Sequence, residues 1–296
     1  MNRTDHGYNN FVIKAYIITL INNGDSMVAT RTLLQSIEKI HNPSNSSGST
    51  IQPFIMPATV PLSIHNDIKN GFSKEYVKTL YDNNGRLKWT WPIHTSQDAI
   101  DFSTGLYKKT YNAADWKKVR ACTVSHMRLW QHCVDIKEPI MILEHDALFT
   151  RPFNYKALAL TGHQKNTSSQ GKEHSSVGEW TGGICGLNDP IGATRKARVF
   201  DAKVKESLHW YKDAGVNGIC TAPYVDDLGD LPLPSGLAGN SAYIIKPWAA
   251  QKLLDKVSEV GLWPNDALMC RQFFPWLQVY FPYFTALQPM KSTTTT

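Results

Sequence analysis

The stretch that decides the fold runs from Pro139 to Pro152 and reads PIMILEHDALFTRP. Its apolar run, residues 140–143, is typical of a short buried strand. Side chains alternate along a strand, so Glu144 and Asp146 share one face and His145 points to the other. Two adjacent carboxylates repel each other, and a hard divalent metal ion is the usual partner that relieves this. A strand that runs into a solvated acidic turn is the alternative.

The chain on either side of this stretch predicts an α/β protein. Residues 11–21 are nearly all apolar, which indicates a strand buried on both faces. Residues 28–40 show helical spacing, and residues 51–60 form a second extended segment. This β-α-β order implies parallel strands with a right-handed crossover. Residues 113–136 carry the clearest helical pattern and lead directly into the acidic strand, whereas residues 161–177 are expected to form a surface loop.

Composition limits the possible classes of protein. The chain has 296 residues, 42% of them hydrophobic, which is enough for one large domain. The formal net charge of +6 favours a polyanionic or phosphorylated partner. The five cysteines show no zinc-type spacing, and their odd number indicates a reducing compartment. No signal peptide and no apolar run of about 20 residues is visible, so we expect a soluble, cytoplasmic protein without stable membrane insertion.

Several common catalytic motifs are missing from the sequence. There is no dinucleotide-binding G-x-G-x-x-G, no phosphate-binding Walker loop and no G-x-S-x-G nucleophile elbow. Dinucleotide chemistry and a serine nucleophile therefore have no support from the sequence.

A set of short motifs instead occurs in a fixed order along the chain. In order they are ACTVSH at residues 121–126 with Leu129-Trp130, ILEHDA at 142–147, GNSAYII at 239–245, Ala249-Ala250 with Leu253-Leu254, Pro264-Asn265-Asp266, and Ser292-Thr293. This order resembles glycosyltransferase family 25, which includes lipopolysaccharide and collagen galactosyltransferases. Departures from that pattern are His145 in place of the middle carboxylate, Ala121 in place of glycine, and residues 20–24 without the family's arginines. They affect recognition of the donor base more than metal binding.

The resemblance implies a GT-A-type nucleotide-sugar-binding α/β fold with a mostly parallel central sheet flanked by helices. Residues 1–296 would form a single domain of this type, with an insertion around residues 155–235. In that fold an acidic pair at a strand end holds Mn²⁺ or Mg²⁺, which bridges the two phosphates of the donor. Asp146 would then be a direct metal ligand, and Glu144 would contact the metal or the donor ribose.

The resemblance also assigns roles to other side chains. Asp266 is the expected general base for the acceptor hydroxyl, although a helix cap fits the same position. Ser125 and His126 are expected near the donor, with a buried helix histidine as the alternative for His126. Asn240 and Thr19 complete the expected donor-binding set, and a simple turn residue is the alternative for Asn240.

These features predict a metal-dependent glycosyltransferase, inverting by resemblance. It would move a hexosyl or pentosyl group from a nucleotide-diphosphate sugar to a hydroxyl on a polyanionic acceptor. The net charge and the basic run at residues 195–212 are equally compatible with DNA that carries a hydroxymethylated pyrimidine and with a phosphorylated lipopolysaccharide core. The departures of the donor-side segment from the family pattern favour DNA, and lipopolysaccharide is the alternative. A solvated face is the alternative for the basic run. Two other classes remain open at this point: a metal-dependent phosphoesterase or nuclease using residues 144–146, and a non-catalytic carbohydrate- or nucleic-acid-binding module.

Overall fold

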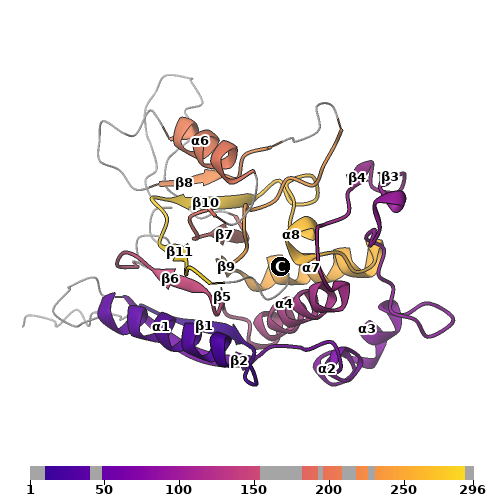
Figure 1. Cartoon of the computed structure of the whole chain (residues 1–296), viewed down its shortest axis with the longest axis horizontal. Coiled ribbons are helices and arrows are strands. Elements are labelled where there is room, and N and C mark those ends of the chain that lie inside the picture. The colour runs from indigo at the N-terminus through magenta and orange to yellow at the C-terminus, as the bar shows by residue number, and fades with distance from the viewer. Residues whose placement is uncertain are drawn as a thin grey trace, which may run out of the picture.

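A seven-stranded sheet forms the centre of the computed structural model, which describes residues 11–40, 49–153, 182–192, 196–208, 218–225 and 231–290. The strand order is β2-β1-β5-β9-β7-β10-β8 (Figure 1). The bounds are β1 Phe11–Thr19, β2 Ser49–Pro57, β5 Ile140–Glu144, β7 Ile184–Gly186, β8 Gly218–Thr221, β9 Ala242–Ile245 and β10 Leu277–Phe281. Two small antiparallel pairs lie outside it: β3 (Ala99–Asp101) with β4 (Leu106–Lys108), and β6 (Ala147–Phe149) with β11 (Thr285–Leu287).

The central sheet is mixed but has one dominant strand direction. β1 runs parallel to β2 and β5, and β7 runs parallel to β10. β9 is antiparallel to β5 and β7, and β8 is antiparallel to β10. Five strands (β2, β1, β5, β7 and β10) therefore share one direction and two (β9 and β8) oppose it. The expected α/β class, with a central sheet flanked by helices, is confirmed.

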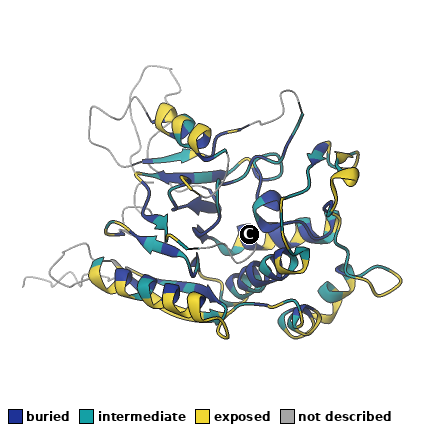
Figure 2. Cartoon of the chain, viewed as in Figure 1, coloured by how far each residue is buried: buried dark blue, intermediate teal, exposed yellow. Residues whose placement is uncertain are grey.

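Helices cover both faces of the sheet. Those in the described residues are α1 (Gly24–Ile40), α2 (Ile64–Gly71), α3 (Lys74–Thr79), α4 (Trp116–Ile136), α6 (Ala197–Ser207), α7 (Pro247–Val260) and α8 (Asn265–Leu268), with the 3₁₀ turn η1 (Thr95–Gln97). The strand β5 shows the two-sided burial most clearly. Met141 and Leu143 pack in a cluster with Leu33 of α1, while Ile140 and Ile142 pack in another with the α4 and α7 side chains. The outward faces of α1 and α2 are exposed (Figure 2).

The first strand differs from the expectation that residues 11–21 are buried on both faces. Ile13 and Ala15 are buried, but Val12 is 50% exposed and Lys14 pairs with Glu138 at the surface. Burial on both faces is reached only at residues 17–19. The buried face packs in one cluster with Leu33 and Ile37 of α1, whereas the opposite face begins with exposed Val12 and the Lys14–Glu138 ion pair.

The segment expected as an insertion, residues 155–235, supplies β7 and β8 to the central sheet and also contains α6. The expected surface loop at residues 161–177 lies outside the described residues, as do Ser292 and Thr293. All five cysteines are free. None of the helices in the described residues combines the length and apolar character that a membrane crossing requires.

Candidate active site

A cleft of about 1580 Å³ opens where β1, β2 and β5 end. Its walls come from the loops after those strands, the first half of α4, residues 239–241 before β9, residues 264–266 at α8 and residues 287–290. Ligands of open α/β sheets bind at the carboxyl ends of the strands, so this is where a substrate site is expected. The cleft unites segments that are more than 200 residues apart in the chain.

Glu144 and Asp146 both line this cleft, as the sequence predicts. The Glu144 side chain is 29% exposed. Oδ1 of Asp146 is buried and has no hydrogen-bond partner among the described residues. Burial, and after it the charge of Glu144, raises the pKa of Asp146 to about 7. A buried, unpartnered carboxylate oxygen beside a second carboxylate fits a divalent cation, which would satisfy both groups.

His145 is also among the residues that line the cleft, although it is only 8% exposed. Its imidazole forms a hydrogen bond with the backbone of Ile18 in the neighbouring strand β1. The expectation that its side chain points away from the two carboxylates stays a prediction. Burial is the main influence on the imidazole and lowers the pKa of His145.

Asp266 reaches the same cleft from a different element. Its Oδ1 accepts hydrogen bonds from the Tyr111 hydroxyl at 3.1 Å and from the Ala267 N–H at 3.0 Å. Burial raises the pKa of Asp266, while these two bonds act in the opposite direction. The helix α8 begins at Asn265 with Pro264 in the capping position, so Asp266 does not serve as the N-cap. Its role as a base stays a prediction that the geometry allows.

The other expected donor contacts divide into two groups. Asn240 lines the cleft, and its Oδ1 is buried without a hydrogen-bond partner among the described residues. Its neighbour Ser241 also lines the cleft with an unpartnered buried hydroxyl. Thr19, by contrast, is fully buried outside the cleft lining, and its hydroxyl pairs with that of Thr30 at 3.0 Å. Thr19 is therefore not placed to contact a donor bound in the cleft.

Ser125 borders the cleft, but its hydroxyl is already used. Its Oγ accepts the N–H of Thr59 at 2.9 Å and donates to the carbonyl of Ala121 at 3.0 Å. It ties the loop after β2 to α4 and is 1% exposed. Its contribution is therefore to the shape of the cleft wall.

Replacing Ser125 with alanine is expected to lower the free energy of unfolding by about 1–3 kcal/mol, because the buried Thr59 N–H loses its acceptor. Urea unfolding measures this change. The matched control is Ser207→Ala on exposed α6, where the hydroxyl only donates to the Lys203 carbonyl. The control is expected to change stability by less than about 0.5 kcal/mol. Equal effects of the two substitutions would contradict the anchoring role.

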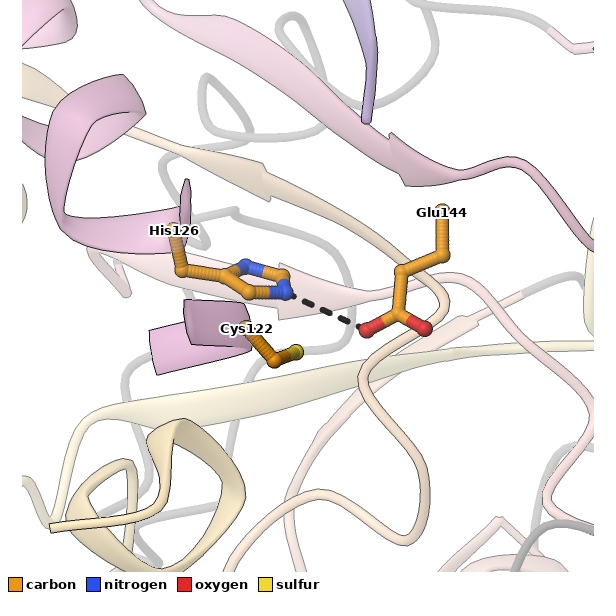
Figure 3. A group of neighbouring side chains, drawn as sticks. All are labelled: Cys122, His126 and Glu144. Atoms are coloured by element: carbon orange, nitrogen blue, oxygen red, sulfur yellow. Dashed lines mark hydrogen bonds and ion pairs between the residues drawn. The ribbon is translucent and has the colours of Figure 1, made fainter. Parts of the chain in front are cut away.

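His126 is fully buried and is not among the described residues that line the cleft. Its Nε2 lies 3.2 Å from Oε1 of Glu144, and its Nδ1 lies 2.9 Å from the Tyr243 hydroxyl. Figure 3 shows His126 and Cys122, both from α4, facing Glu144. The potential ligand atoms of these three residues lie within 4.8 Å of one another, the spacing of a possible metal site.

Sequence reasoning assigned no role to Tyr111, Cys122 or Tyr243. Tyr111 lies in a stretch without periodicity, so nothing in the sequence singled it out. Cys122 and His126 are four residues apart on one helix, which places them on the same face and could have paired them. Burial, and after it the charges of Glu144, Asp266 and Asp146, raises the pKa of the Cys122 thiol, which shows how the carboxylates surround it.

Within the basic run at residues 195–212, the described residues 196–208 do not line the cleft. Lys196 and Lys203 donate to backbone carbonyls of residues 224–225, and Lys205 pairs with Asp201. The helix that carries them, α6, lies beside β8 at the far side of the sheet from α1 (Figure 1). Lys118 is the one Lys or Arg among the described residues that line the cleft.

The cleft lies at the carboxyl edge of an α/β sheet, and its neighbouring carboxylates suit a bound divalent cation. A comparison with family models matches residues 93–269 to glycosyltransferase family 25 (LPS biosynthesis protein), and the chain belongs to this family. The protein is thus a glycosyltransferase, as the order of its motifs predicts. No curated protein matches the chain.

Proposed function

We propose that the protein transfers a hexosyl or pentosyl group from a nucleoside diphosphate sugar to an acceptor hydroxyl, with inversion at the anomeric carbon. The observation that carries this proposal is the buried, unpartnered Oδ1 of Asp146 beside Glu144, in the same cleft as Asp266. Family membership supports the transfer of a sugar. We also propose that the fold is of the GT-A type.

Asp146 and Glu144 would hold Mn²⁺ or Mg²⁺, and the bound ion would neutralise charge on the departing diphosphate. The acceptor oxygen forms a bond to the anomeric carbon while the bond from that carbon to the diphosphate oxygen breaks. Asp266 takes the proton of the acceptor hydroxyl. Tyr111 and the Ala267 N–H hold Oδ1 of Asp266 in place for this step.

The acceptor that we propose is a hydroxymethylated pyrimidine in DNA. The cleft, at about 1580 Å³, exceeds the roughly 300–1,000 Å³ of most single-ligand sites, which leaves room for an extruded base beside the donor. The net charge of +6 favours a polyanion. The basic residues of α6 are not part of this support, because they are not among the residues that line the cleft.

Donor binding is tested by thermal unfolding with nucleoside diphosphates and nucleotide sugars, with and without Mn²⁺. A saturating donor with Mn²⁺ is expected to raise the melting temperature by about 5 °C, because it binds only the folded state. Release of nucleoside diphosphate from one donor would identify the nucleotide and sugar. Cleavage of DNA without a donor would indicate a nuclease instead, and no response in either assay would leave a binding module.

The acceptor is tested by intact mass of hydroxymethylated DNA after incubation with each donor. The expected result is a gain of one hexose or pentose per modified base, with unmodified DNA as the control. Transfer to lipopolysaccharide but not to this DNA would overturn the acceptor and leave the transfer chemistry intact.

A further inference from the structure

Four side chains form a continuous line of hydrogen bonds that ends at the cleft. The Trp130 Nε1–H donates to the Tyr243 hydroxyl at 2.9 Å, and that hydroxyl lies 2.9 Å from Nδ1 of His126. Nε2 of His126 lies 3.2 Å from Oε1 of Glu144. The first three residues are fully buried, while the Glu144 side chain is 29% exposed to the cleft. Two of the four come from α4, one from β9 and one from β5.

The chemistry of these groups fixes the direction of every bond in the line. An indole N–H can only donate, so the Tyr243 oxygen accepts from Trp130. The single hydroxyl proton of Tyr243 then has one acceptor among the described residues, Nδ1 of His126. A neutral imidazole that accepts at Nδ1 carries its proton at Nε2, and this N–H donates to the Glu144 carboxylate.

Both other forms of the imidazole leave a buried group without a partner. With the proton at Nδ1, the hydroxyl proton of Tyr243 has no acceptor and the Nε2 lone pair faces the Glu144 carboxylate. With protons on both nitrogens, the Tyr243 proton is again unpaired. Unpaired buried polar groups are strongly disfavoured, so the Nε2–H form is the one that satisfies all four residues.

We propose that Trp130 and Tyr243 are positioning residues that hold His126 in its Nε2–H form, so that His126 fixes one oxygen of Glu144 and leaves the other to the cleft. The effect on transfer rests on the proposed function, in which Glu144 helps to hold the metal ion. Among the described residues Oε2 of Glu144 has no hydrogen-bond partner, and it is the oxygen left for a ligand. Figure 3 shows the His126–Glu144 contact that ends the line.

This line of hydrogen bonds also explains why Cys122, His126 and Glu144 do not form a preformed metal site, although their spacing would allow one. A metal ion binds the lone pair of an imidazole nitrogen, and in this arrangement Nε2 carries a proton. The same bonds account for three family-like motif positions at once, because Trp130, His126 and Tyr243 are all in the motifs at residues 121–130 and 239–245.

The first test needs no catalytic activity. Long-range ¹H–¹⁵N NMR of the metal-free wild-type protein at neutral pH reports the proton positions on the His126 ring, with His126→Gln identifying the signal. The expected result is a protonated Nε2 and an unprotonated, hydrogen-bonded Nδ1. A proton at Nδ1, alone or together with one at Nε2, overturns the proposal.

The second test measures Mn²⁺ affinity by titration of the full chain. Tyr243→Phe is expected to weaken Mn²⁺ binding about 10-fold to 100-fold, the usual effect of removing a group that orients a metal ligand. His126→Gln, which keeps a donor near the Nε2 position, is expected to stay within about threefold of wild type, whereas His126→Asn shows the full loss. Equal affinities in the Gln and Asn variants overturn the proposal. A wild-type protein that binds no Mn²⁺ would contradict the proposed function. The NMR result would still show whether His126 is held in its Nε2–H form.

Discussion

Replacing Asp146 with asparagine is expected to lower the rate of glycosyl transfer by about a thousandfold or more, with the fold intact. The substitution keeps the shape of the side chain and removes the charge that the proposed metal ion needs. The change is measured as turnover at saturating donor, together with Mn²⁺ titration, which should show little binding. The site is sensitive because Oδ1 of Asp146 is buried without a partner among the described residues.

Asp25→Asn is the matched control for this substitution. Asp25 also lines the cleft, but it is exposed in the first turn of α1 and away from the acidic turn after β5. Its loss is expected to change turnover by less than about threefold. A large loss of turnover in both variants would indicate a general effect of cleft charge, and unchanged turnover in Asp146→Asn would remove the metal assignment.

The Asp146→Asn variant is also expected to change the pH dependence of stability. Burial and Glu144 raise the pKa of Asp146 from 3.8 to about 7 in the folded protein. Between these values the unfolded chain has lost the proton that the folded chain retains, so stability falls as the pH rises from about 4 to about 7. Asp146→Asn removes this loss. The difference in melting temperature between Asp146→Asn and metal-free wild type is therefore expected to increase from pH 5 to pH 8. At pH 8, Mn²⁺ is expected to raise the melting temperature of the wild type.

The predicted site residues that line the cleft include those defined by chain geometry. Glu144 and Asp146 follow a strand whose burial is visible in its composition, and Asp266 follows a proline that starts a helix. The carboxyl end of a strand in an α/β sheet opens toward a cleft, and this is where Glu144 is found. Charge and strand position therefore place these carboxylates at one cleft, while their roles stay predictions.

Hydroxyl groups could not be assigned in this way. Nothing in a sequence shows whether a hydroxyl is used by a neighbouring backbone group, and the hydroxyls of Ser125 and Thr19 both are used inside the protein. Tyr243 is the converse case. It reads as an apolar strand residue, but its hydroxyl joins Trp130 and His126 from a helix more than 100 residues earlier in the chain.

Replacing Asp266 with asparagine is expected to lower transfer by about 10²-fold to 10⁴-fold while leaving donor binding unchanged. The carboxylate would no longer accept the proton of the acceptor hydroxyl, but the acidic pair after β5 is untouched. Two measurements separate these effects: turnover with acceptor, and the rise in melting temperature with donor and Mn²⁺. A loss of both would indicate that Asp266 shapes the cleft instead of acting on the acceptor.

The Tyr111→Phe variant tests the role of Asp266 as the base through the pH dependence of the reaction. Burial raises the pKa of Asp266, and the hydrogen bond from Tyr111 opposes that rise. Without the hydroxyl the pKa of Asp266 rises further, so the fraction of ionised base at a given acidic pH falls. The acid limb of the kcat/KM profile is then expected to move to higher pH, while the rate on the alkaline side of the limb changes little. An acid limb that stays in place would show that the ionisation of Asp266 does not control the reaction, because no other described side chain donates a hydrogen bond to its carboxylate.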